Sequence, residues 1–183
     1  MKEVLVSRRL SLLCAVGLAA GTLSLAGLAS AHPVDAVKAG TRVGPIRFGV
    51  TTLKESKAHF GDPTSRQRVR LGCIRAVRVR WGNKLQVMYT TDTPRLAIEA
   101  TVRQRTIQSA ISGALTFHTR KGLRVGDRGA RLRRLYPNAN TEKHGRHWDH
   151  FLVSSARYGR LVAITKSRRG PVAALFSGPY ENC

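Results

Sequence analysis

Acidic residues are scarce in this chain. Only 10 of its 183 residues are Asp or Glu, whereas 32 are Lys or Arg, so the formal net charge at pH 7 is +22. With so few carboxylates, no paired-carboxylate pattern for acid–base catalysis stands out. The chain also lacks a Gly-x-Ser-x-Gly elbow, a His-Glu-x-x-His motif and the Walker and dinucleotide-binding loops. We therefore expect a protein that is not an enzyme and that carries no cofactor.

Aromatic residues are also few, at 6% of the chain. The sequence has no helix-turn-helix, zinc-finger or stacked-aromatic pattern, so sequence-specific recognition of nucleic acid is not expected. We assign Trp81, Tyr89 and Trp148 to the core or to the surface of a sheet, because aromatic side chains favour burial. A ligand-binding role for these three is the less favoured alternative.

Cysteine is limited to three positions, Cys14, Cys73 and Cys183. Cys14 follows Leu13 inside an apolar run, where a lipid anchor would need a small residue before the cysteine. In an exported chain the other two favour one disulfide, Cys73–Cys183, which would close a loop of 111 residues. The chain-entropy model gives such a loop roughly 4–5 kcal/mol. A nucleophilic Cys73 and free or intermolecular thiols are the alternatives.

Only one apolar run is long, and it lies near the N-terminus. Residues 10–28 are uncharged, basic residues precede them, and residues 29–31 read Ala-Ser-Ala. This pattern predicts a secretory signal over residues 1–31, cleaved before His32. An uncleaved membrane anchor is the alternative, which the glycines and hydroxyl residues of the run disfavour. After cleavage we expect no membrane span and a location that is secreted or in the cell envelope.

The region after residue 31 is 152 residues long and has a formal charge of +20, because the signal carries three basic residues and one acidic residue. Hydrophobic residues make up 42% of the whole chain, which is enough for a packed core despite the charge. A region of this length suits one domain, or two small repeats that share a core.

Two short helices are predicted, each after a short extended segment that ends in glycine. Thr52 and Glu55 fit a capping box at the start of the first helix. Residues 123–126 echo residues 46–49 at an offset of 77, which indicates an internal repeat. The predicted helices span residues 52–60 and 128–136.

Alternation of apolar and polar residues predicts three antiparallel strands after each helix. A two-residue turn at Gly82-Asn83 is expected to join the first two strands. The strands are predicted over residues 74–81, 85–90 and 96–103 in the first half, and near 149–155, 161–166 and 172–177 in the second.

These segments predict an α+β fold of two similar halves, each a short helix followed by antiparallel strands, with the helices packed on one face of the sheet. The expected boundaries are a signal peptide at 1–31, a flexible leader at 32–41, a first repeat at 42–105, a connector at 106–121 and a second repeat at 122–183.

Two segments carry a family resemblance. The first begins Ile46-Arg-Phe-Gly-Val-Thr-Thr-Leu and ends Phe60-Gly-Asp-Pro63, and the second begins Gly122-Leu-Arg-Val-Gly-Asp127 and ends Leu132-Arg-Arg-Leu-Tyr-Pro137. They resemble an exported bacterial module seen in secreted β-lactamase inhibitory proteins and small outer-membrane assembly lipoproteins. The arrangement is closer still to uncharacterised secreted actinobacterial proteins. The resemblance implies helices on one face of an antiparallel sheet. It does not extend to the inhibitory loops, so β-lactamase inhibition is not carried over.

Three histidines, His144, His147 and His150, are spaced by three beside Asp149. Imidazoles and a carboxylate can ligate Zn²⁺ or Cu²⁺, and on a helix this spacing would bring the rings together. Gly145 and the β pattern that follows favour a loop entering a strand, where residues 147 and 150 face opposite sides. We therefore expect no metal site, and metal binding by these residues is the alternative.

Arginine carries the strongest signal, with 24 arginines against 8 lysines. Guanidinium groups bind phosphates and carboxylates through paired hydrogen bonds. We expect an anion-binding surface on two neighbouring extended segments and on the second helix. A solvated basic surface that reflects codon usage is the alternative. The expected anion-binding residues are Arg66, Arg68, Arg70, Arg78, Arg80, Arg131 and Arg134.

The predicted function is a secreted, non-enzymatic binding or envelope-associated protein that contacts anionic envelope polymers or lipid head groups through this basic surface. The alternative is a secreted inhibitor or protein-partner-binding module that uses the face of its sheet and an apolar interface centre. A cell-wall hydrolase is a third class, which no recognisable base and nucleophile supports.

Overall fold

The described part of the chain is mostly β with two short helices. A computed structural model describes residues 36–71, 74–155 and 159–179. The helices are α1 (Leu53–Phe60) and α2 (Gly129–Leu135). The remaining regular elements are strands, so the expected antiparallel sheet with two short helices is confirmed, although helix is a smaller share than an α+β fold implies.

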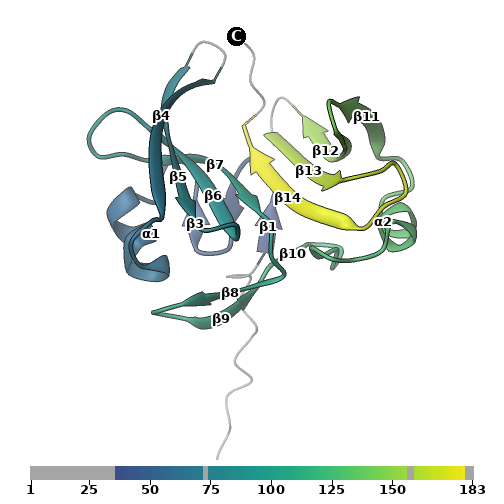
Figure 1. Cartoon of the computed structure of the whole chain (residues 1–183), viewed down its shortest axis with the longest axis horizontal. Coiled ribbons are helices and arrows are strands. Elements are labelled where there is room, and N and C mark those ends of the chain that lie inside the picture. Colours follow the sequence, from purple (N-terminus) through teal and green to yellow (C-terminus); the bar gives the residue numbers. More distant parts are fainter. Residues whose placement is uncertain (1–35, 72–73, 156–158, 180–183) are drawn as a thin grey trace, which may run out of the picture. The chain divides into compact units, whose positions relative to one another are not determined.

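An eight-stranded antiparallel sheet dominates the fold (Figure 1). Two runs of four consecutive strands form it, and the last strands of the two runs, β7 and β14, pair with each other. The strand order is β11-β12-β13-β14-β7-β6-β5-β4. The first run consists of β4 (Ser65–Leu71), β5 (Ile74–Trp81), β6 (Leu85–Thr90) and β7 (Ala97–Val102), and the second of β11 (Asn140–His144), β12 (His147–Ser155), β13 (Gly159–Thr165) and β14 (Val172–Gly178).

Two smaller sheets use segments that, apart from the extended residues 46–47, the sequence patterns left without regular structure. One has the order β10-β1-β2-β3, and the other pairs β8 with β9. Residues 36–38, expected in a flexible leader, form β1, in which Ala36 and Val37 are buried. The bounds are β1 (Ala36–Lys38), β2 (Arg42–Val43), β3 (Ile46–Arg47), β8 (Thr106–Ser109), β9 (Gly113–Thr116) and β10 (His118–Thr119).

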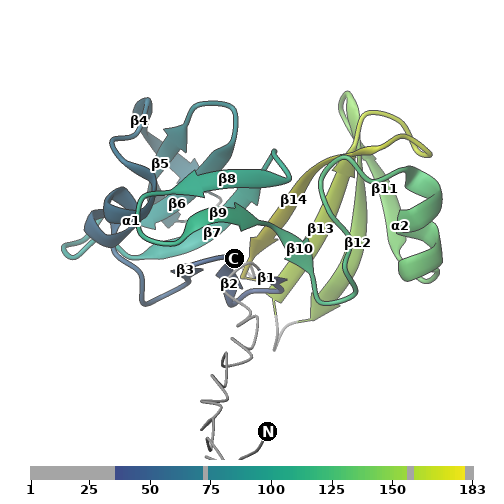
Figure 2. The same cartoon turned by 90° about the horizontal axis from the view of Figure 1, so that it is seen from below.

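One face of the large sheet carries the core. Residues that pair directly across antiparallel strands point to the same face, so the register defines one continuous row. Both ends of the row meet a helix region: the indole Nε1 of Trp81 donates to the carbonyl of Gly61 (2.9 Å), and His150 shares a cleft with Leu132. In both views α1 lies beside the first run and α2 beside the second (Figure 1, Figure 2). The row is Trp81, Leu85, Val102, Leu175, Ala163 and His150, all buried.

The two helices begin differently. At α1 the predicted capping box is confirmed: the Glu55 amide donates to the Thr52 hydroxyl (3.2 Å), and the Thr52 amide donates to the Glu55 carboxylate (2.7 Å). These hydrogen bonds favour the charged carboxylate, so they lower the pKa of Glu55. At α2 the N-cap residue is Arg128, and its side chain makes no capping hydrogen bond. The fold therefore stabilises the start of α2 by contacts outside the helix.

Three details differ from the sequence expectations. The turn between β5 and β6 has three residues, with the Lys84 amide donating to the carbonyl of Trp81 (3.2 Å) and Gly82 at a φ of 56°. The strand β11 was not predicted, because residues 140–144 are all polar and show no apolar alternation. The extended segment at residues 65–71 forms β4, an edge strand that pairs with β5.

Several predictions fall outside the described residues. The signal segment at 1–31, Cys73 and Cys183 lie outside the residues that the structure describes, so export and the disulfide stay predictions. Within residues 36–71, 74–155 and 159–179, neither helix has the length and apolar character that crossing a bilayer demands.

Candidate anion-binding surface

The hairpin of β4 and β5 concentrates positive charge at one edge of the large sheet. Between Ser65 and Trp81 the sequence contains six arginines and no acidic residue. Strand β4 is the edge strand, with β5 as its sheet neighbour, so its side chains have neighbours on one side only. Local sequence alone therefore concentrates positive charge along this hairpin.

The register divides the expected anion-binding arginines between two faces. Arg66 and Arg68 stand opposite Val79 and Val77, so they share the core-bearing face with these buried residues. Arg70 lies two residues further along the same strand and therefore has the same orientation. The prediction that these three share a side is confirmed by the pairing.

Arg78 and Arg80 point to the opposite face. A guanidinium nitrogen of Arg78 donates to the Gln67 side-chain carbonyl (3.5 Å), and Nε of Arg80 donates to that of Gln86 (3.1 Å). Arg80 and Gln86 also line a shallow cavity of about 300 Å³ together with Arg103. The five arginines of the hairpin that were predicted to bind anions thus form two groups rather than one surface.

A cleft of about 370 Å³ joins Arg68 and Arg70, but not Arg66, to two arginines that sequence reasoning missed. Arg75 stands opposite Arg70 at the end of the hairpin. Arg95 comes from the loop before β7, where its carbonyl accepts a hydrogen bond from the Leu53 amide at the start of α1 (3.0 Å). We call Arg68, Arg70, Arg75 and Arg95 the hairpin cluster; Thr91 completes the polar lining.

Arg95 has an unmet hydrogen-bonding capacity inside this region. Its Nε is buried and has no hydrogen-bond partner among the described residues. A buried donor without an acceptor is unfavourable by about 1–3 kcal/mol. No sequence pattern indicates Arg95, because the loop that carries it is brought beside β4 and β5 only by the fold.

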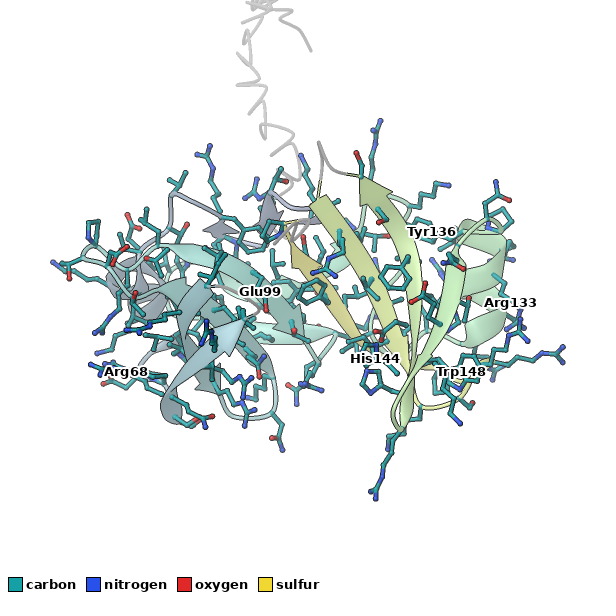
Figure 3. The ribbon with its side chains drawn as sticks, turned by 90° about the horizontal axis from the view of Figure 1, so that it is seen from above. Arg68, Glu99, Arg133, Tyr136, His144 and Trp148 are labelled. Atoms are coloured by element: carbon teal, nitrogen blue, oxygen red, sulfur yellow. The ribbon has the colours of Figure 1, made fainter. Side chains whose placement is uncertain are left out.

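The two expected residues on α2 lie at the other end of the sheet. Arg131 is already engaged, since its Nε lies 3.2 Å from the Asp127 carboxylate and its Nη2 donates to the Gly122 carbonyl (3.4 Å). Arg134 is exposed on the same helix. Neither joins the hairpin cluster, so the seven predicted arginines do not form one site; Figure 3 shows Arg68 and Arg133 at the two ends of the sheet.

Three of the described acidic residues, Asp62, Asp127 and Asp149, are engaged locally. Asp62 pairs with Lys57 (2.6 Å), and this hydrogen bond lowers the pKa of Asp62. Asp127 accepts from the Arg124 amide (2.9 Å) as well as lying beside Arg131, and Asp149 lies between two histidines. No carboxylate is among the described residues that line the cleft of the hairpin cluster.

The structure places His147 and His150 on opposite faces, as the strand pattern predicted, but brings His144 beside His147. A turn at residues 145–146 pairs His144 with His147, whose rings stack with centroids 6.0 Å apart. Asp149 lies 3.4 Å from Nε2 of His147 and 3.8 Å from Nδ1 of His144. His150 lies on the other face, buried, with its ring nitrogens 3.1 Å from the hydroxyls of two threonines. Among the described residues, no group of three or more His, Cys, Asp and Glu side chains could hold a metal.

Comparisons of the chain with family models, with curated proteins and with solved structures find no match in any of the three. Function must therefore be argued from the charge and geometry of the surface itself.

Proposed function

We propose that this is an extracytoplasmic, non-enzymatic protein that binds anionic polymers through the hairpin cluster. One observation carries the proposal: Arg68, Arg70, Arg75 and Arg95 surround a cleft of about 370 Å³ to which no acidic side chain contributes. Guanidinium groups are suited to phosphate and carboxylate groups because their planar forks donate paired hydrogen bonds. An extended anionic polymer can contact the cleft and the exposed edge strand together.

The charge of the whole chain supports the same partner class. At a formal +22, its long-range field attracts polyanions and accelerates their encounter with the surface. Such binding releases counterions, so the affinity falls steeply as the salt concentration rises. A protein-binding sheet face with an apolar centre would instead depend weakly on salt.

The proposal includes export and one disulfide. A cleaved signal over residues 1–31 would deliver the protein to anionic envelope polymers, and a Cys73–Cys183 bridge would suit an oxidising compartment. N-terminal sequencing of protein recovered from culture medium tests the cleavage before His32. A thiol assay on unreduced protein tests the bridge, and two titratable thiols in the cleaved chain would contradict it.

We also propose that the two runs of strands are two similar halves of an internal repeat. Equivalent backbone hydrogen bonds support it: the Gly49 amide donates to the carbonyl of Ala97 (2.7 Å), and the Gly126 amide donates to that of Val172 (2.8 Å). Ala97 and Val172 each begin the last strand of a run, and both glycines have a positive φ. Superposition of the two halves in an experimental structure tests the repeat, and strands that fail to coincide would contradict it.

The test of polyanion binding compares two triple variants with the same change in charge. Arg68→Gln, Arg75→Gln and Arg95→Gln together remove most of the hairpin cluster. Arg78→Gln, Arg80→Gln and Arg103→Gln together remove three arginines from the opposite face. Binding of heparin and of polyphosphate is measured by titration over a series of salt concentrations. Circular dichroism and thermal unfolding establish that each variant is folded.

We expect the first variant to bind at least about tenfold more weakly than the second, because each charged hydrogen bond contributes about 1.5–3 kcal/mol. The slope of log affinity against log salt should fall by about 0.7–0.9 for each lost phosphate contact. Equal losses in both variants would show that net charge, not the cleft, determines binding. Binding that does not depend on salt in the unaltered protein and in both variants would contradict the proposal and favour a protein-binding sheet face.

A further inference from the structure

A second basic cleft lies at the other end of the sheet, where α2 faces strands β11 and β12. Its volume is about 490 Å³, within the usual range for small-molecule pockets of about 300–1,000 Å³. Three arginines contribute to its lining: Arg133 from α2, and Arg168 and Arg169 from the turn between β13 and β14. We call this site the helix–turn cleft. Figure 3 shows Arg133 and Tyr136 on the same side of the strands that carry Trp148.

Gly129 allows the helix to approach the turn closely enough to form the cleft. A Cβ atom built on Gly129 would lie 2.7 Å from the carbonyl oxygen of Gly170 and closer still to that of Arg169. Two backbone hydrogen bonds hold the approach, from the Gly126 amide to the Val172 carbonyl (2.8 Å) and from the Val172 amide to the Asp127 carbonyl (2.9 Å). The arginines of the helix and of the turn are therefore brought together by a rigid backbone contact.

The three arginines of the cleft lack compensating charge. Among the described residues, no carboxylate lies within 4 Å of a guanidinium nitrogen of Arg133, Arg168 or Arg169. The guanidinium of Arg168 lies 5.9 Å from the ring centroid of Trp148, which orients its side chain over the strands. The carbonyls at the end of α2 disfavour an anion, but the Lys121 ammonium donates to one of them, that of Leu135 (3.0 Å).

His150 forms a buried, neutral part of the cleft lining. The Thr165 hydroxyl donates to the Ser167 carbonyl (2.6 Å), so Nε2 of His150 must be the donor to that hydroxyl oxygen (3.1 Å). Nδ1 lies 3.1 Å from the hydroxyl oxygen of Thr141, a hydroxyl that also donates to the Ala139 carbonyl (3.4 Å). Burial lowers the pKa of His150, and the charges of Arg133 and Arg168 lower it further, against the opposing effect of Asp149. Because the His150 ring is uncharged, the positive charge of the cleft lining comes from its arginines.

Apart from Thr141, the remaining lining is apolar. Leu132, Pro137, Ala139 and the ring of Tyr136 form one wall, while the Tyr136 hydroxyl points away and donates to Thr119 (2.7 Å). A carboxylate has two oxygens, whereas a phosphate monoester has three terminal oxygens and carries about −1.5 to −2 charge, which suits three guanidinium groups better. The volume of the cleft leaves room for an organic group against the apolar wall.

We propose that the helix–turn cleft binds a phosphate monoester, with Arg133, Arg168 and Arg169 on the phosphate oxygens and the apolar wall against the organic part of the ligand. The phosphate monoester can be part of a free small molecule or the end of a polymer, because both present the same terminal phosphate group. This site is separate from the hairpin cluster, and the proposal does not depend on polyanion binding there.

The test titrates the purified protein with phenyl phosphate, inorganic phosphate and benzoate by calorimetry. We expect phenyl phosphate to bind more tightly than inorganic phosphate, because its ring contacts the apolar wall, and benzoate to bind at least about tenfold more weakly. Arg133→Gln and Arg168→Gln should each weaken phenyl phosphate binding about tenfold or more. Arg134→Gln is the matched control, since it removes the same charge from the next residue of α2 without touching the cleft lining.

A measurement on the unaltered protein keeps the test independent of variant folding. Bound phosphate offsets the charges of Arg133 and Arg168, so the pKa of His150, followed by NMR of its ring nitrogens, should rise when phenyl phosphate is added. A phosphodiester oligomer with and without a terminal phosphate distinguishes a polymer end from a free ester. Tighter binding of the phosphorylated oligomer than of phenyl phosphate assigns the site to polymer ends, and the reverse assigns it to free esters.

Three results would overturn the proposal: no binding of either monoester, an unchanged His150 pKa at saturation, or equal weakening by Arg134→Gln and Arg133→Gln. The triple variant of the hairpin cluster should retain phenyl phosphate binding. In that variant, polyanion binding tests the proposed function and phenyl phosphate binding tests the helix–turn cleft. The two proposals can therefore fail independently of each other.

Discussion

The two short helices are held in place by opposite means. At α1 a large side chain makes the contact: Trp81 is 6% exposed, its ring centroid lies 5.8 Å from that of Phe60, and its indole donates to the Gly61 carbonyl. At α2 the contact depends on a missing side chain, because Gly129 lets the helix meet the backbone of the 169–170 turn. A smaller side chain at position 81 should therefore weaken the contact with α1, whereas a larger side chain at position 129 should weaken the contact of α2.

The same contrast separates the two basic clefts. In the hairpin cluster, Arg68 and Arg70 share a face because side chains alternate along a strand, so local sequence already places them together. In the helix–turn cleft, Arg133 meets Arg168 across 34 intervening residues. The hairpin arginines of the first cleft therefore follow from local sequence. Arg95 of that cleft and the whole helix–turn cleft depend on packing between distant segments.

Trp81→Ala should have the largest effect on stability. Removing a buried Trp typically costs about 3–5 kcal/mol of unfolding free energy, and here the indole hydrogen bond is lost as well. Urea unfolding measures the loss, and hydrogen exchange should show α1 less protected than α2. Trp148→Ala is the control, and we expect a smaller loss because Trp148 is only half-buried. Equal losses would contradict the anchoring role of Trp81.

Gly129→Ala should destabilise the protein by about 1–3 kcal/mol, the usual cost of overpacking. The sign of this change in unfolding free energy is informative, because Ala is normally a better helix former than Gly by about 1 kcal/mol. The variant should also weaken phenyl phosphate binding at the helix–turn cleft while leaving polyphosphate binding by the hairpin cluster unchanged. Unfolding curves and calorimetry measure these effects, with exposed Ala130→Val as the control. A stabilised variant would disprove the close contact.

The helix starts provide a smaller comparison. Thr52→Ala removes the capping box of α1 and should lower the unfolding free energy by about 1 kcal/mol. Arg128→Ser offers a capping hydroxyl to α2, which has none, and should raise the unfolding free energy by about 0.5 kcal/mol. Thermal and urea unfolding of the two variants measure opposite shifts. Shifts of the same sign would show that the caps do not determine the stability of these helices.

The pH dependence of stability should show the burial of His150. Because its pKa is lowered in the folded state, the unfolded chain binds more protons between that lowered pKa and about pH 6.5. Stability from this residue is present above about pH 6.5 and declines as the pH falls below it. His150→Gln should flatten that part of the profile.

Burial also lowers the pKa of His59 at the other end of the molecule, so the double variant with His59→Gln should be flatter still. Unfolding free energies measured between about pH 5 and pH 8 test both changes. An unchanged slope in His150→Gln would contradict the assignment.

Part of the fold followed from local patterns. Thr52, Glu55 and Gly61 determine the bounds of α1 through hydrogen bonds within one short segment, and alternation identified β5 and β6. The residues of β11 are polar and became a strand only because β12 offers hydrogen bonds to them. The hairpin turn at residues 145–146 was likewise visible only once the pairing of His144 with His147 was known.

The candidate sites show the same division. Alternation was sufficient to put Arg66, Arg68 and Arg70 on one side of β4, and Arg78 and Arg80 on the side of β5 away from its apolar residues. Only the pairing of the two strands showed that these two groups lie on opposite faces of the sheet. Arg95 enters the hairpin cluster from a loop, and no local pattern indicates that a loop residue will lie beside a strand far from it in sequence.

Charge, strand periodicity and the capping of α1 were determined by the sequence itself, because each depends on residues that are near neighbours along the chain. The composition of the two basic clefts was decided by tertiary structure. Arg95 meets Arg68 and Arg133 meets Arg168 because sheet pairing and the bare backbone of Gly129 bring distant segments together. The free energy of such contacts comes from packing between elements, which no short stretch of sequence specifies.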